Sequence, residues 1–346
     1  MIDSKEISVV VQGAIDKNLT QKCLNSIRLL LPKSVIILST WEGSDAEGLN
    51  YDVLIKNKDP GAELCDLEYN IKNNVNRQIL STKNGLMNTT TKYALKLRSD
   101  IVLKNNNFLK YFTKFDNFRN KECKIFKNRI IINNLYCANR KKTNFLFHIS
   151  DWVQFGLTED IFNLWDIQLQ KEPETSKYFL NKERPLIDPV STWLFQYIPE
   201  QYIWKSCLEK NGIDIKFEYF TDLNERNIEI NDLAFANNVV IVNYEEYGIK
   251  FLKFDPYKWD YQSQMDYFIW QKLYKKYCNN NYKISIKYSW KEKLEVENFV
   301  LKYNIHKNRL PSLKIFIREF LAMTFYLIAT IFSCFFNLYK LIKKDN

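Results

Sequence analysis

The first hundred residues alternate between short β-branched runs and stretches with helical spacing, and this alternation limits the fold more than any other feature. Residues 7–12 (ISVVVQ) are typical of a strand buried in a parallel sheet. From Thr20 to Leu31, apolar side chains recur every three or four residues, which predicts a helix that Pro32 ends. Further strands are expected at 34–39, 52–56 and 93–97, and a long helix at 67–87. Such alternation over short connections predicts a doubly wound α/β sheet.

Polar clusters follow three of these predicted strands at the point where each strand ends. They are Gln12-Gly13, Trp41-Glu42-Gly43-Ser44 and Arg98-Ser99-Asp100. Ligands of doubly wound sheets bind beyond the carboxyl ends of the strands. We therefore expect the three clusters to lie along one edge of the sheet, where a ligand would bind.

The composition narrows the partners and the chemistry. The 346 residues carry 50 Lys and Arg against 40 Asp and Glu, and a net charge of +10 favours an anionic partner: nucleic acid, a phosphorylated substrate or an anionic membrane face. No zinc-finger, helix-turn-helix or RNA-recognition motif is present, which argues against nucleic acid. Seven scattered cysteines without a CxxC spacing are typical of a reduced, cytosolic protein. Two histidines are too few for a multi-histidine metal site.

The two ends of the chain differ in their relation to a membrane. The N-terminal sequence MIDSKEISVVVQG has neither the basic segment nor the long apolar core of a signal peptide. Residues 320–339, by contrast, are 20 consecutive residues without a charge, which as a helix would extend about 30 Å, the thickness of a bilayer core. The flanking basic residues are Lys314, Arg318, Lys340, Lys343 and Lys344. A helix in the membrane interface, a single span and a helix docked on its own domain all stay open.

Four residues are candidates for a functional site, and each of them also has an ordinary structural explanation. Asp100 ends a buried strand, where an acid holds a metal or a sugar hydroxyl, or caps a turn. Arg77 on the predicted helix is either an arginine that binds a phosphate or an ordinary surface arginine. Asp151 has a polar and aromatic setting typical of sugar sites, or makes an Asx turn. Glu200 follows Pro199, which is also ordinary helix-start chemistry.

Taken in order, several segments resemble one family. The segments are SVVVQG, CLNSIR, IILSTWEGS, YDVLIKNKDPG, NRQILSTKNGL, YALKLRSD, HISDW and PEQYIW. They resemble the WavE-type lipopolysaccharide-synthesis proteins over roughly residues 7–205. More broadly, the layout is similar to GT-A glycosyltransferases of the family-2 type. The resemblance implies a GT-A-like (Rossmann-like) fold and transfer of a sugar from a nucleotide-sugar donor.

The resemblance also implies a set of donor-binding residues. Gln12 and Gly13 would line the nucleotide pocket, and Glu42 would be the acid after the second strand. Arg77 would meet the diphosphate. Asp100 would match the second Asp of the metal-binding DxD.

Two positions depart from the family-2 pattern. The first Asp of DxD is Arg98 here. Glu200 matches the first member of the acidic pair, but the second member, which supplies the base in that family, is Gln201. A divalent metal (Mn²⁺ or Mg²⁺) at Asp100 and a metal role taken over by Arg98 are therefore both open, and Glu200 and Asp151 are the candidate bases.

We accordingly predict an α/β fold with a mostly parallel sheet flanked by helices and a C-terminal hydrophobic helix. The expected divisions are a GT-A-like catalytic domain at 1–250 (nucleotide-sugar half 1–103, acceptor half 104–250), a basic and aromatic extension at 251–313, and a membrane-associating helix at 314–346.

The predicted function is an inverting glycosyltransferase with a lipopolysaccharide, lipooligosaccharide or other cell-surface glycan as acceptor. A lipid-linked acceptor would explain a basic, membrane-seeking tail on an anionic membrane surface, at the cytoplasmic face of the inner membrane. The alternative is a catalytically degenerate GT-A-like protein that binds or scaffolds glycan-assembly components.

Overall fold

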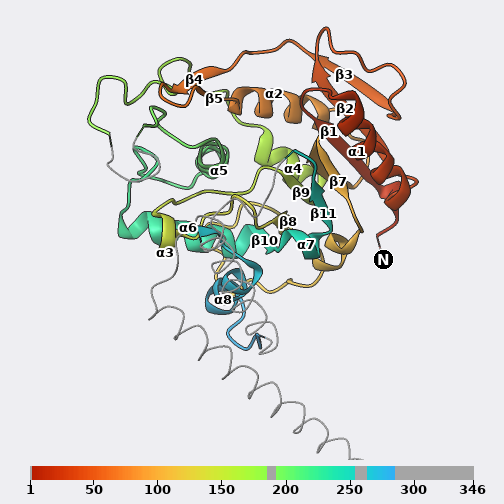
Figure 1. The fold of residues 1–346 in the computed structure, drawn as a ribbon. Coiled ribbons are helices and arrows are strands. Elements are labelled where there is room, and N and C mark those ends of the chain that lie inside the picture. The colour runs from red at the N-terminus through yellow and green to blue at the C-terminus, as the bar shows by residue number, and fades with distance from the viewer. Residues whose placement is uncertain (1, 185–191, 254–262, 285–346) are drawn as a thin grey trace, which may run out of the picture. The chain divides into compact units, whose positions relative to one another are not determined.

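A seven-stranded sheet forms the centre of the protein. The computed structural model describes residues 2–184, 192–253 and 263–284 (Figure 1), which belong to one compact unit. In order across the sheet, the strands are β10 (Val239–Val242), β8 (Ile130–Asn133), β9 (Val153–Leu157), β6 (Tyr93–Arg98), β1 (Ile7–Gln12), β2 (Val35–Trp41) and β3 (Val53–Asn57). Only β9 runs antiparallel to its neighbours. The predicted mostly parallel sheet is confirmed.

Helices flank this sheet. They are α1 (Lys17–Leu30), α2 (Val75–Leu86), α4 (Thr158–Trp165), α5 (Pro199–Lys210), α6 (Glu225–Asn238) and α8 (Tyr267–Tyr277). The chain steps from β1 to β3 in one direction and returns through α2 to β6, so right-handed crossovers place α1 and α2 on opposite faces. Helix α2 lies so close to the sheet that a Cβ on Gly85 would be 2.5 Å from Val10 Cγ1. A side chain at Gly85 would force the two elements apart.

The helix predicted at 67–87 is wrong in its first part. A hairpin of β4 (Glu63–Asp66) and β5 (Ile71–Asn73) occupies this region, and α2 begins only at Val75. The Asp66 carboxylate accepts the backbone N–H groups of Glu68 and Tyr69, which makes a turn in place of a helix. The side-chain Oδ1 of Asn73 then accepts the N–H of Val75 at 3.0 Å and fixes the start of α2.

Shorter elements complete the described part of the chain. They are η1 (Ser4–Glu6), β7 (Ile101–Leu103), η2 (Asn107–Tyr111), α3 (Arg140–Thr143), α7 (Tyr244–Tyr247) and β11 (Ile249–Phe251), with β7 and β11 paired antiparallel. A small second core joins the β4–β5 hairpin to the segment before α5. Its buried members are Cys65, Phe179, Leu194, Phe195, Ile198 and Phe220.

Several predictions fall on other parts of the chain. The C-terminal helix at 314–346 lies outside the described residues, as does most of the extension at 251–313, and the proposed division at 103/104 stays a prediction. Within the described ranges, no helix combines the length and the apolar character that crossing a bilayer requires. The six described cysteines are buried free thiols.

Candidate functional site

The polar clusters at the ends of β1, β2 and β6 lie along one edge of the sheet, as predicted. The pairing aligns Gln12 with Ser39 on one side and with Arg98 on the other, so these strands end together. The Ser99 N–H donates to the Gln12 carbonyl at 3.0 Å, which ties the loop after β6 to the loop after β1. The carboxyl edge of the sheet is therefore the place to look for a ligand site.

Gln12 and Gly13 shape the part of this edge next to α2. The Gln12 side chain is buried, and its Oε1 accepts from Ser81 Oγ at 2.9 Å. Gly13 has a φ of +119°, which disfavours any residue with a side chain, and a Cβ there would lie 3.4 Å from Ser99 Oγ. These contacts hold the backbone of the loop close to Ser99 and Asp100.

Arg98 and Asp100 form a two-point ion pair at the same edge. Arg98 Nε lies 3.2 Å from Asp100 Oδ1, and Nη2 lies 2.8 Å from Oδ2. The guanidinium also lies 4.4 Å from the centre of the Trp152 ring. The Arg98 side chain keeps 35% of its surface exposed and that of Asp100 13%. The cation is thus held in one orientation, yet a ligand can still reach it.

Aromatic rings from different parts of the chain pack together beside Arg98, and the sequence does not reveal this cluster. Trp152 stacks on Tyr136 with ring centres 5.2 Å apart. The edge of Phe251 meets Trp152 at 4.8 Å. These rings come from the loop after β8, the residue before β9, and β11. Three separated segments therefore meet beside one guanidinium.

A buried lysine, Lys96, lies directly behind Asp151. Its ammonium donates to the backbone carbonyl of Asp151 and lies 4.6 Å from the centre of the Trp165 ring. Burial lowers the pKa of Lys96 to about 8, while the Asp151 charge acts in the opposite direction. Asp151 is 2% exposed, and its Oδ1 has no hydrogen-bond partner among the described residues. An orphaned buried carboxylate oxygen beside a buried cation is costly, and such sites are often functional.

Glu200 is the second residue of α5 and lies near His148. Its Oε2 is 3.9 Å from His148 Nε2. Burial raises the pKa of Glu200 well above 4.5, and the neighbouring charge of Asp151 raises it further. Arg98 acts in the opposite direction on the same carboxyl. Glu200 is therefore held in its protonated form over a wider pH range than an exposed glutamate.

His148 complements a protonated Glu200. Its Nδ1 lies 2.7 Å from the Tyr136 carbonyl oxygen, which can only accept. Burial lowers the pKa of His148 to about 4, so the ring is neutral at pH 7. The hydrogen-bond network assigns the ring proton to Nδ1 and leaves the lone pair of Nε2 on the side of Glu200.

Gln201, which stands where the family-2 pattern has its second acid, is fully buried and structural. Its Nε2 donates to the carbonyls of Leu146 at 2.8 Å and Phe220 at 2.9 Å. Its Oε1 accepts the N–H of Ile198 at 3.2 Å. A carboxylate could accept but could not donate, so an acid does not fit this environment.

Gln201→Glu is expected to destabilise the protein by about 2–4 kcal/mol, because two buried carbonyls lose their donors and a charge is buried. Thermal unfolding would measure the loss at neutral pH. Glu209→Gln, at an exposed position of the same helix, is the control and should change stability by less than about 1 kcal/mol. A Gln201→Glu protein as stable as the wild type would contradict the structural role.

Arg77 and Glu42 do not join this cluster. Arg77 on α2 binds Asp59 at two points, with Nε–Oδ1 at 2.7 Å and Nη2–Oδ2 at 2.6 Å, and this pairing raises the pKa of Arg77. Glu42 is exposed beyond the end of β2. The structure therefore brings together four predicted residues (Arg98, Asp100, Asp151 and Glu200), sets Gln12 and Gly13 beside them, and leaves Arg77 and Glu42 apart.

A divalent metal fits these side chains poorly. Both Asp100 oxygens face the Arg98 guanidinium. Over the described ranges, no group of three or more His, Cys, Asp or Glu residues could hold a metal ion. A cation next to Asp100 would also meet the positive charge of Arg98. The chemistry of this donor set favours an anionic ligand on Arg98.

A family model described as WavE lipopolysaccharide synthesis matches residues 7–300. This match includes every residue of the cluster at the carboxyl edge. No curated protein matches the chain.

Proposed function

The chain belongs to the WavE lipopolysaccharide synthesis family, and from this premise we propose that it is an inverting glycosyltransferase of GT-A type. It would transfer a sugar from a nucleotide-sugar donor to a lipid-linked glycan acceptor such as a lipopolysaccharide core. The main support for the proposal is a pair of buried, neighbouring carboxyl groups, Asp151 and Glu200. They lie next to the Arg98 guanidinium at the carboxyl edge of the sheet. Glycosyl transfer needs a base for the acceptor and positive charge for the leaving group, and this cluster supplies both.

The two carboxyls would share one proton. Because burial and, after it, the charge of Asp151 raise the pKa of Glu200, we place the shared proton on Glu200. The Lys96 ammonium donates to the backbone carbonyl of Asp151, and the Asp151 charge in turn raises the pKa of Lys96. Asp151 is then the base, Glu200 is its neutral partner, and Lys96 is a positioning residue that holds the Asp151 backbone.

In the reaction, the acceptor oxygen attacks the anomeric carbon while the bond to the diphosphate oxygen breaks. The electron pair of that bond leaves with the diphosphate, and the acceptor proton passes to the Asp151 carboxylate. Arg98, oriented by Asp100 and Trp152, would stabilise the charge that develops on the diphosphate.

The donor nucleotide would lie over the ends of β1 and β2, next to Gln12, Gly13 and Glu42. Arg77 could meet the diphosphate only by leaving Asp59, so its role depends on a rearrangement when the donor binds. We further propose that the protein works at the cytoplasmic face of the inner membrane, where the uncharged segment 320–339 and its basic flanks would favour an anionic surface.

A screen of nucleotide-sugar hydrolysis by the purified protein tests the proposed function. We expect one donor to be hydrolysed faster than the others, and Asp100→Ala to abolish this activity because Arg98 loses the partner that orients it. Circular dichroism would check that the variant is folded. Wild-type activity in Asp100→Ala would reject this site, and no hydrolysis of any donor by the wild type would reject the function.

A degenerate, glycan-assembly scaffold is the second candidate, and it is favoured by Arg98 and Gln201 at two positions that are acidic in the family-2 pattern. Calorimetry with UDP, GDP and CMP, with and without Mn²⁺, separates the two candidates. Binding of one nucleotide supports the transferase, and no binding supports the scaffold.

A further inference from the structure

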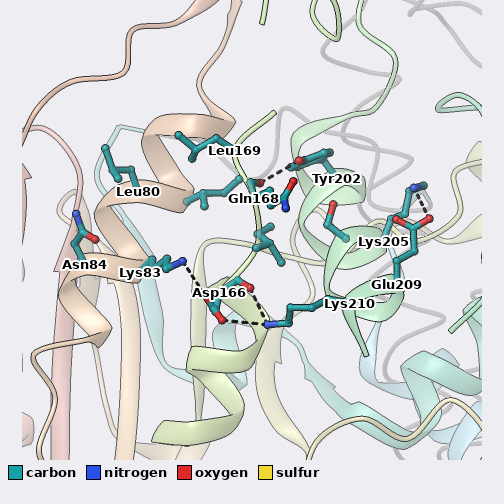
Figure 2. Close-up of a pocket in the computed structure, with 13 residues that line it drawn as sticks. Leu80, Lys83, Asn84, Asp166, Gln168, Leu169, Tyr202, Lys205, Glu209 and Lys210 are labelled. Atoms are coloured by element: carbon teal, nitrogen blue, oxygen red, sulfur yellow. Dashed lines mark hydrogen bonds and ion pairs between the residues drawn. The ribbon is translucent and has the colours of Figure 1, made fainter. Parts of the chain in front are cut away.

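A groove of about 850 Å³ lies between helices α2 and α5 (Figure 2), and neither Asp151 nor Glu200 lines it. Leu80 and Lys83 on α2 form one side, Tyr202 and Lys210 on α5 form the other, and the segment 166–169 lies between them. Its volume is in the range of small-molecule and oligosaccharide sites. None of the residues that the sequence predicts for the site lines it.

The charged groups of the groove are paired with one another, although three lysines against two carboxylates leave a net charge of +1. Lys83 Nζ lies 2.6 Å from Asp166 Oδ1, and Lys210 Nζ lies 3.7 Å from Oδ2 of the same residue. Lys205 pairs with Glu209 at 2.6 Å. A phosphate or carboxylate ligand would have to compete with Asp166 and Glu209 for these lysines, which weakens anion binding despite the single excess positive charge. The Lys210 ammonium is already used by the backbone carbonyls of Asn163 and Asp166, at 2.8 and 2.7 Å. Lys83 has further N–H groups, however, and a paired carboxylate keeps free lone pairs, so hydroxyl groups can still bind.

Apolar surface alternates with these polar groups. Leu169 is 41% exposed, and Leu80 lines the groove across from it. The Tyr202 hydroxyl donates to the Gln168 carbonyl at 3.0 Å, which fixes the ring at the side of the groove. An uncharged ligand with both C–H faces and many hydroxyls matches such a lining, and a sugar chain has this chemistry.

The groove is near the reaction site but separate from it. Glu200 and Tyr202 are two residues apart on α5, which is about 3 Å along the axis, but at ~100° per residue they point to nearly opposite sides of the helix. Glu200 lies next to Asp151, and Tyr202 lines the groove. A chain of sugars could therefore lie in the groove while its end reaches round α5 to the pair.

We propose that the groove between α2 and α5 binds an uncharged stretch of the acceptor glycan, several sugars away from the hydroxyl that reacts. This inference rests on the proposed glycosyltransferase function, which supplies the reason for a glycan. The groove would select acceptors long enough to fill it and hold them during transfer.

Leu80→Trp tests the groove, because an indole at this position fills it without changing a charge. Leu29→Trp, the same change at a leucine on α1 that is 79% exposed, is the matched control. The probe is core oligosaccharide released from lipopolysaccharide by mild acid and then dephosphorylated, with binding followed by saturation-transfer NMR and calorimetry. We expect wild type and Leu29→Trp to bind alike, and Leu80→Trp to bind at least tenfold more weakly.

Equal binding by Leu80→Trp and Leu29→Trp would overturn the proposal, as would absence of binding to the wild type. Binding that requires the phosphates, or that inorganic pyrophosphate displaces, would also overturn it by showing an anion site. Binding at the groove is measured without a donor, so this outcome is independent of nucleotide-sugar turnover. Loss of turnover with groove binding intact would instead count against the proposed reaction.

Discussion

Asp151→Asn lowers the rate of sugar transfer by about 10²–10⁴-fold at pH 7, if Asp151 takes the proton of the acceptor hydroxyl. The amide has nearly the same shape but cannot accept a proton, while the backbone carbonyl that Lys96 binds is unchanged. Steady-state kinetics would place most of the loss in kcat, because the substitution removes an interaction of the transition state. The donor KM should change little, since Arg98 and Asp100 keep their pairing.

Glu200→Gln is the informative comparison. Glutamine resembles the protonated form in which Glu200 is held, so we expect transfer at pH 7 to fall by less than about tenfold. In Asp151→Asn the charge that raises the pKa of Glu200 is gone, so residual activity should increase with pH as Glu200 ionises. The opposite ranking, with Glu200→Gln far slower than Asp151→Asn, would assign the base to Glu200.

Stability gives a readout of the same proton without substrate. The folded state keeps a proton on Glu200 above 4.5, so it binds more protons than the unfolded state. The free energy of unfolding therefore falls as pH rises through the raised pKa. Glu200→Gln removes this dependence, and chemical denaturation from pH 5 to 8 would detect the flatter profile. A profile as steep as that of the wild type would contradict the protonated state of Glu200.

The sheet could be predicted because its signal is local. Strands β1, β2 and β6 are apolar runs, and each run is followed by polar or turn residues. Parallel pairing brings the ends of these strands together, independently of the conformation of the loops. The β4–β5 hairpin could not be found in this way, because ELCD and IKN are too short and too polar to show a period. Its turn depends on side-chain bonds of Asp66, which compete with the helix that the surrounding pattern favours.

The site was less predictable, because its meaning depends on contacts between distant segments. The sequence identifies Asp151 and Glu200 as candidate acids, but only the fold makes them neighbours and raises the pKa of Glu200. The sequence contains one indication of Lys96, which is a lysine between two leucines in the middle of a predicted buried strand. Tyr136 and Phe251 left none, since each reaches Trp152 from a different part of the chain.

Arg98→Met is expected to lower kcat by about 10²–10³-fold, because it removes the positive charge that we propose stabilises the leaving diphosphate. The methionine keeps an unbranched side chain over Trp152 but leaves Asp100 without its ion pair. Arg98→Lys keeps the charge and loses the two-point geometry, so it should fall between Arg98→Met and the wild type. Equal rates for Arg98→Met and the wild type would remove Arg98 from the mechanism.

We also predict how the proposed sugar transfer responds to a chelator. If the Arg98 guanidinium supplies the charge at Asp100, EDTA should leave wild-type transfer within about twofold, because no step passes through a metal there. Added Mn²⁺ should not rescue Arg98→Met, since the lone Asp100 carboxylate offers too few ligands among the described side chains. Loss of wild-type activity in EDTA with recovery in Mn²⁺ would show that Asp100 exchanges its arginine for a metal when the donor binds. Arg98 would then be a counter-ion of the empty site and not the group that stabilises the leaving diphosphate.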